Sequence, residues 1–116
     1  MIVSNKPRAW AEVILKERGW VETPLICPGP FMQRKPSPDM LNRAQMELRR
    51  GRGAQRVVAI GDTIVDLEAA RRAKIPFVGV AWSVGFEKRR TIENWQTFLR
   101  CIRANGVGGL NVYLGS

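Results

Sequence analysis

The apolar run from Val57 to Ile60, closed by Gly61, constrains the fold more than any other segment of the chain. Its two valines and its isoleucine are β-branched, and an uninterrupted run of this kind is typical of a strand that is buried on both faces of a parallel sheet. Parallel strands must be joined by crossover connections, which are usually helices. The run therefore predicts an α/β fold, with helices on the faces of the sheet.

Strand and helix patterns alternate along the chain, as a parallel sheet flanked by helices requires. No repeat or linker divides residues 1–116, so we expect a single domain. In the first helix, Trp10, Val13 and Ile14 form an apolar stripe at helical spacing, which is expected to face the core. The pattern predicts further strands at 2–3, 25–27, 77–80 and 111–114, and helices at about 7–19, 37–51, 65–74 and 91–105.

The 116 residues carry a formal charge of +9. This excess of positive charge favours acidic partners, which include phosphorylated small molecules, nucleic acid and acidic proteins. There is no histidine, so the commonest general base and zinc ligand is missing. Cys27 and Cys101 have no metal-site spacing and are interpreted as buried free thiols of a cytoplasmic protein. No apolar stretch approaches the roughly 20 residues of a membrane helix, so no membrane partner is expected.

Two carboxylates, Asp62 and Asp66, directly follow the predicted buried strand. Asp62 is expected at the tip of the strand, and Asp66 in the first turn of the next helix. Hard oxygen ligands in this position suit magnesium, which typically binds one or two carboxylates together with waters and phosphate oxygens. The structural alternative is that Asp62 caps the helix and Asp66 complements its dipole.

Two other segments have the character of anion-binding sites. Lys35 stands in a proline-rich loop just before a predicted helix, and both its ammonium group and the helix N-terminus attract anions. Ser4 and Asn5 follow the first strand and can donate hydrogen bonds to a phosphate oxygen. A solvated loop lysine and ordinary helix capping are the structural alternatives.

Together these segments resemble the haloacid dehalogenase-like hydrolases, in particular the phosphoglycolate-phosphatase type, from residue 2 to about residue 87. The resemblance implies a Rossmann-like parallel sheet flanked by helices. It also implies that Ser4 and Asn5 bind phosphate, that Lys35 neutralises the phosphate charge, and that Asp62 and Asp66 hold Mg²⁺.

The family's nucleophile has no counterpart here. In the family, an Asp-x-Asp segment on the first, central strand supplies it, whereas the third aspartate of this chain, Asp39, lies in the second predicted helix. We therefore expect a truncated family core that lacks the first strand and the cap, and that is not a competent phosphatase alone. Two alternatives stay open: a subunit of a split magnesium-dependent phosphohydrolase, and a basic module that binds nucleic acid or an acidic protein.

A missing central strand would leave its two neighbours with unpaired backbone groups, each costing on the order of 1–3 kcal/mol when buried. Three arrangements would compensate for this cost. The tail, at about 105–116, could add a strand to the sheet. Two chains could pair through their exposed edges, which predicts a homo-oligomer. The strand at 57–60 could also close directly against the strand at 2–3.

Overall fold

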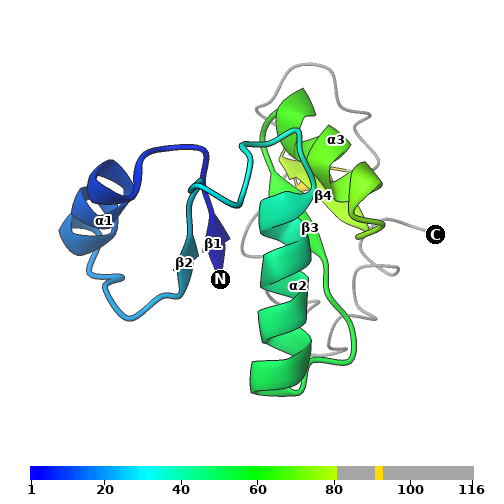
Figure 1. Cartoon of the computed structure of the whole chain (residues 1–116), viewed down its shortest axis with the longest axis horizontal. Helices are drawn as coiled ribbons and strands as arrows, with labels where there is room; N and C mark the ends of the chain where they lie inside the picture. Colours follow the sequence, from blue (N-terminus) through cyan, green and yellow to red (C-terminus); the bar gives the residue numbers. More distant parts are fainter. Residues whose placement is uncertain (81–90, 93–116) are drawn as a thin grey trace.

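The computed structural model describes residues 1–80 and 91–92. Within these residues, helices and parallel strands alternate, so the predicted α/β fold is confirmed (Figure 1). The helices are α1 (Arg8–Glu17), α2 (Asp39–Arg52) and α3 (Ile64–Arg72), and the strands are β1 (Ile2–Val3), β2 (Leu25–Ile26), β3 (Ala59–Gly61), β4 (Phe77–Val80) and β5 (Thr91–Ile92).

The strands form two separate sheets. In the first, β1 pairs with β2, with Ile2 opposite Leu25. In the second, the order is β3-β4-β5, with Ala59 opposite Phe77. Among the described residues no pairing joins β1 to β3, so direct closure of these two strands, one of the three possible arrangements, is not formed. Figure 1 shows the β1–β2 pair set apart from the β3 and β4 strands.

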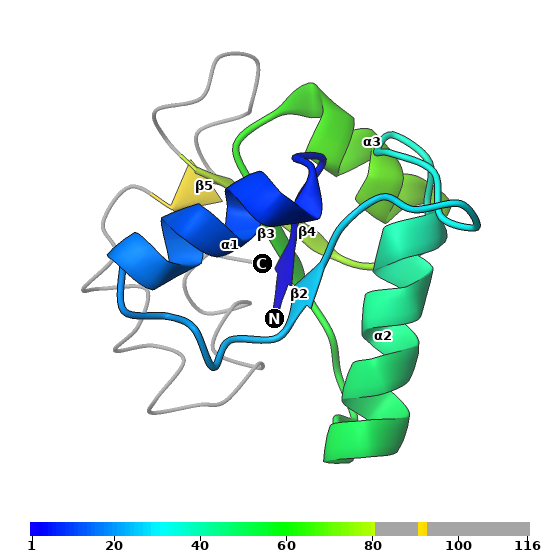
Figure 2. The same ribbon diagram turned by 60° about the vertical axis from the view of Figure 1, so that its left-hand side comes forward.

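The first and second helices have local start and stop signals that the sequence provides. Pro7 precedes α1, where its missing N–H costs nothing because the first helical N–H groups have no partner within the helix. Gly53 ends α2 with a positive φ of 66°, a conformation that glycine adopts without steric cost. Figure 1 shows the β1–β2 pair between α1 and α2, and the rotated view in Figure 2 shows α1 in front of the strands.

One apolar cluster connects the two sheets through α2 and α3. Small side chains allow α3 to approach the strands closely, and Leu41 of α2 completes the cluster. Val3 of β1 and Ala59 of β3 both pack against it, although the two strands belong to different sheets. Helix packing therefore fixes how far apart the two sheets stand. The buried members are Leu41, Ala69, Ala70, Ala73 and Ile75.

The first helix packs through a different face from the predicted one. Ala11 and Leu15 are its buried residues, whereas Trp10 is 67% exposed and Val13 and Ile14 are also exposed. A sheet of two short strands is too narrow to cover the whole apolar stripe of a helix that lies on it. The prediction that Trp10, Val13 and Ile14 face the core is therefore wrong within the described residues.

The strand after Arg56 is shorter and less buried than its apolar run predicts. Regular pairing begins at Ala59, and the side chain of Ile60 is 42% exposed. The run was expected to be buried on both faces, but within residues 1–80 and 91–92 β3 has a sheet neighbour only on its β4 side. Thr91 and Ile92 also differ from expectation, because they form β5 and not the start of a helix.

Several predictions fall on residues outside the described part. These are the rest of the helix at 91–105, the strand at 111–114, the tail at about 105–116 and the thiol of Cys101. Cys27 is described: it is a buried free thiol, as predicted, and burial raises its pKa. Among the described helices, none combines the length and the apolar character needed to cross a membrane.

Candidate phosphate site at the strand ends

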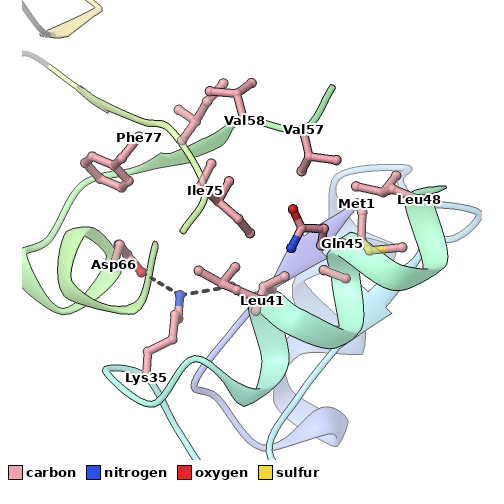
Figure 3. A pocket seen from close by; sticks show the side chains of 14 residues that line it. Met1, Lys35, Leu41, Gln45, Leu48, Val57, Val58, Asp66, Ile75 and Phe77 are labelled. Atoms are coloured by element: carbon pink, nitrogen blue, oxygen red, sulfur yellow. Dashed lines mark hydrogen bonds and ion pairs between the residues drawn. The ribbon is translucent and has the colours of Figure 1, made fainter. Parts of the chain in front are cut away.

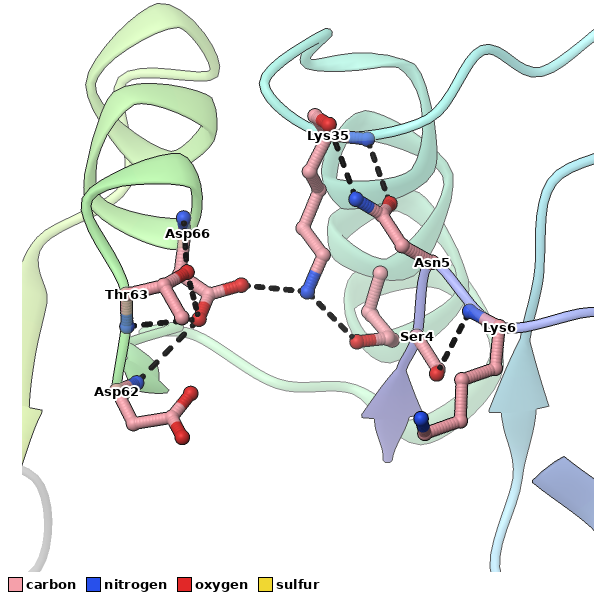
Figure 4. A network of polar contacts seen from close by, with 8 residues as sticks. Ser4, Asn5, Lys6, Lys35, Asp62, Thr63 and Asp66 are labelled. Carbon is pink, nitrogen blue, oxygen red and sulfur yellow. Dashed lines mark hydrogen bonds and ion pairs between the residues drawn. The ribbon is translucent and has the colours of Figure 1, made fainter.

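The polar residues singled out in the sequence meet where β1 and β3 end (Figure 4). Ser4 and Asn5 follow β1, and Asp62 follows β3. Lys35 comes from the loop before α2, and Asp66 from the first turn of α3. Since the carboxyl ends of parallel strands are where ligands bind in open α/β sheets, this position suits a binding site.

Asn5 fixes the backbone of the loop that carries the lysine. Its Nδ2 donates to the carbonyl oxygen of Lys35 at 3.0 Å, and its Oδ1 accepts from the Lys35 N–H at 2.7 Å. The amide thus pairs with both backbone groups of one residue. Next to it, Ser4 Oγ accepts from the N–H of Lys6 at 3.1 Å, and the hydroxyl can still donate its own proton.

The ammonium group of Lys35 connects the end of β1 to the first turn of α3. Its Nζ donates to the carbonyl oxygen of Val3 at 3.0 Å and to Oδ1 of Asp66 at 2.5 Å. The side chains of Lys35 and Asp66 are 12% and 16% exposed, so water screens this ion pair only weakly. A positive charge is therefore held at a fixed position between the ends of β1 and β3.

Asp66 has a structural role besides its contact with the lysine. Its Oδ2 accepts from the Thr63 hydroxyl at 2.8 Å, from the Thr63 N–H at 3.2 Å and from the Asp62 N–H at 3.3 Å. The Asp66 N–H donates in return to Thr63 Oγ1, which completes a capping box at the start of α3. The helix cap is therefore Thr63, which our sequence reading did not identify, although the Thr-x-x-Asp spacing is a recognisable signal for it.

The charged form of Asp66 is favoured by these partners. Burial by itself raises the pKa of the carboxyl, but the hydrogen bonds from Lys35 and Thr63 outweigh it and hold the pKa below its usual value. Gly61 makes the arrangement possible, because a Cβ at this position would lie 2.6 Å from Cβ of Asp66. The close approach that Gly61 permits is thus to Asp66 itself.

The carboxylates fit magnesium only in part. Both oxygens of Asp66 are engaged, Oδ1 by Lys35 and Oδ2 by the helix cap, so a direct metal bond would have to displace one of these contacts. Asp62 is exposed and carries a carboxylate at the tip of β3. Over residues 1–80 and 91–92, no three acidic, histidine or cysteine side chains lie close enough to form a cation site. These residues alone do not make a complete magnesium site.

A groove of about 200 Å³ leads from this cluster between the two sheets (Figure 3). Lys35 and Asp66 line one end, and most of the remaining lining is apolar. Val3 lies on the β1 side, and Val58 and Ile60 lie on the β3 side. Leu41, Ala44 and Leu48 of α2 and Ile75 also line it.

Comparisons with known proteins identify the family to which this chain is similar. Residues 1–74 match the family model of the haloacid dehalogenase-like hydrolases. The chain is 38% identical over 74 residues to the N-acetylmuramic acid 6-phosphate phosphatase of Pseudomonas aeruginosa, covering 62% of this chain and 32% of that protein. It is 36% identical over 83 residues to the phosphoglycolate phosphatase of Xanthomonas campestris pv. campestris, covering 70% and 37% of the two chains.

A solved structure of a similar protein has a similar fold. The crystal structure of a Lactobacillus delbrueckii subsp. bulgaricus protein assigned as a phosphoglycolate phosphatase superposes with a TM-score of 0.65 at 26% identity. The superposition covers 86% of this chain and 44% of the other. The segments shared with the curated relatives make up about a third of the length of those relatives. The chain therefore belongs to the haloacid dehalogenase-like hydrolases and, within them, is of the phosphoglycolate-phosphatase type.

Proposed function

We propose that this chain holds the phosphate-binding part of a phosphatase site and that, as these 116 residues, it binds phosphorylated small molecules without hydrolysing them. The observation that carries the proposal is the fixed ammonium group of Lys35 at the end of β1, with Ser4 beside it. A partly buried ammonium group that is held by its own hydrogen bonds attracts an anion more strongly than a solvated lysine does, because it is already ordered and weakly screened.

The phosphate would share Lys35 with its present partners. A phosphate oxygen can approach the ammonium group, which has three donors, two of which are directed at Val3 and Asp66. The Ser4 hydroxyl would donate a second hydrogen bond. The relatives' names refer to two phosphorylated acids, N-acetylmuramic acid 6-phosphate and phosphoglycolate. With a formal charge of +9, this chain suits a ligand of the same class, a small phosphorylated carboxylic acid.

Turnover needs an oxygen nucleophile in line with the phosphorus atom. The resemblance gives Asp62 the role of a metal ligand, and no aspartate of these 116 residues matches the family's nucleophile segment. Asp66 is engaged by Lys35 and by the helix cap. Asp39 accepts a hydrogen bond from the backbone of Gln33 at 3.0 Å, at the start of α2. Magnesium would add positive charge near Asp62 when bound, but it would not replace the nucleophile. Binding without hydrolysis is therefore the expected behaviour of the isolated chain.

The test combines binding and activity measurements on the purified chain. Calorimetric titration with phosphoglycolate should detect weak binding that Lys35→Met removes and Ser4→Ala weakens, whereas the neighbouring exposed Lys6→Met should have little effect. Incubation with p-nitrophenyl phosphate and magnesium should release no product above the buffer control. Robust hydrolysis that Asp62→Ala abolishes would contradict the proposal, because it would require a nucleophile within these residues.

A further inference from the structure

Lys35 is held from two elements of the fold, the end of β1 and the helix α3 (Figure 4). On the β1 side, Asn5 binds both backbone groups of Lys35, and the Val3 carbonyl accepts from its ammonium group. On the α3 side, Asp66 in the first turn accepts from the same ammonium group. A contact at the other end of α3 adds a further point of attachment for the lysine loop, residues 33–38.

That contact comes from Arg72, the last residue of α3. Its Nη1 donates at 3.4 Å to the carbonyl oxygen of Pro36, which directly follows Lys35 in the loop. Asp66 and Arg72 are separated by six positions of the helix, a rise of about 9 Å. Lys35 and Pro36 therefore contact α3 near both of its ends, which restrains the loop from rotating relative to the helix.

Glu68 directs the guanidinium group of Arg72 toward the loop. It lies one turn earlier in α3, and its Oε1 accepts from Arg72 Nε at 2.8 Å. The guanidinium group is planar and rigid, so a bond at Nε determines where Nη1 points. The bond to Pro36 is long and the Arg72 side chain is 46% exposed, so this bond alone would be weak. Because Glu68 already orders the group, less entropy is lost when it binds the loop.

Arg71 provides a comparison within the same cluster. It binds the carboxylate of Glu68 through two hydrogen bonds, from Nε to Oε2 at 2.8 Å and from Nη2 to Oε1 at 2.7 Å. In the part of the chain that the structure describes, its side chain makes no hydrogen bond with the lysine loop. Arg71 and Arg72 thus carry the same charge and share one partner, and they differ in whether they reach the loop.

We propose that Arg72, oriented by Glu68, is a positioning residue that holds the lysine loop from α3 while Asn5 holds it from β1, and so keeps Lys35 ordered for an anion. Its effect on the ligand rests on the proposed function, whereas its attachment of the loop does not. Without this attachment the ammonium group would have to be ordered at the moment of binding, which lowers affinity. Arg72 acts through the loop and needs no contact with the ligand.

Calorimetric titration with phosphoglycolate separates this role from a simple electrostatic one. Arg72→Gln should weaken binding by about three- to tenfold, as expected for the loss of one ordering hydrogen bond. Arg71→Gln removes the same charge from the same turn and should change the affinity by less than about twofold. Glu68→Ala removes a negative charge, which by electrostatics alone would strengthen anion binding. Loss of positioning predicts the opposite, a weakening of about two- to threefold.

Amide hydrogen exchange, followed by nuclear magnetic resonance on the full chain, reports on the loop without any ligand. The N–H of Lys35 should exchange about five- to tenfold faster in the two variants that are expected to weaken binding. It should be unchanged in Arg71→Gln. The N–H of Ala73, which donates to the carbonyl of Ala69 at 2.9 Å, should stay protected in all three variants, because the end of α3 remains helical.

Three results would overturn the proposal: equal losses of affinity in Arg71→Gln and Arg72→Gln, tighter binding in Glu68→Ala, or unchanged exchange of the Lys35 amide in Arg72→Gln. Absence of phosphoglycolate binding by the original chain would instead contradict the function proposed for the site. In that case the exchange of the Lys35 amide still decides whether Arg72 holds the loop, so the two failures can be told apart.

Discussion

Replacing Lys35 by methionine removes a side chain that joins the end of β1 to the first turn of α3 through polar bonds. Methionine keeps most of the length and the apolar stem of lysine, so packing in the loop changes little. The variant loses the bond from Nζ to the Val3 carbonyl and the ion pair with Asp66. It leaves a carboxylate that is only 16% exposed without its cation.

The expected cost follows from these two losses. Breaking a fully buried ion pair by removing one partner costs about 3–5 kcal/mol, and this pair is slightly exposed, which reduces the figure to about 2–3 kcal/mol. The lost hydrogen bond to Val3 adds about 1 kcal/mol. A total of about 3–4 kcal/mol is a large part of the roughly 5–15 kcal/mol that stabilises a typical domain. The melting temperature should fall by about 10–15 °C.

Chemical denaturation of four proteins measures this contribution: the original chain, Lys35→Met, Asp66→Asn and the double variant. The double variant should be more stable than the sum of the single changes predicts, by about 1–3 kcal/mol. Exposed Lys16→Met controls for the loss of a positive charge and should change the free energy of unfolding by less than about 0.5 kcal/mol. If Lys35→Met costs no more than Lys16→Met, the ion pair between Lys35 and Asp66 does not stabilise the fold.

Further predictions concern the helix cap and its neighbours. Gly61→Ala should destabilise the chain by about 1–3 kcal/mol in thermal melts, because the added Cβ would overlap Asp66. Gly51→Ala, which lies in α2 with open space around it, should instead stabilise the chain by about 0.5–1 kcal/mol. Thr63→Val should cost about 1 kcal/mol in denaturant melts, since it removes the capping hydroxyl, and an unchanged midpoint would contradict the capping box. The pKa of Asp66 is lower in the folded chain than in the unfolded one, so its stabilisation is complete above about pH 4 and is lost as the pH falls through the folded value. In Lys35→Met, unfolding curves recorded against pH should show a much smaller acid-dependent loss.

The sequence predicted the order of elements well and the burial of some of them badly. Strand β4 was predicted with its exact bounds, and β1, β2 and the three helices within a few residues, because local signals such as Pro7 and Gly53 define helix ends. Burial depends on what lies beside an element, and no local pattern contains that information. Ile60 has the sequence of a fully buried strand, but it lies on the groove edge of β3.

The candidate site was also predicted only in part. Ser4, Asn5, Lys35, Asp62 and Asp66 do lie together, because parallel strands bring their carboxyl ends to one edge. Their hydrogen bonds could not be deduced from spacing. Asn5 was expected to face a ligand, but its amide binds the backbone of Lys35. The phosphate-binding role of these residues stays a prediction until it is measured.

The pairing of Asn5 with Lys35 has a consequence for the chemical ageing of the protein. Both atoms of the amide are held by the loop backbone, which restrains the side chain from the motions that spontaneous deamidation requires. Once the amide is hydrolysed, Nδ2 becomes an oxygen that faces the carbonyl of Lys35, and a donor is replaced by an acceptor. Hydrolysis would therefore break one of the two bonds that hold the lysine loop at the end of β1. Asn5→Asp, which introduces the same change directly, should lose ligand affinity while it keeps its secondary structure.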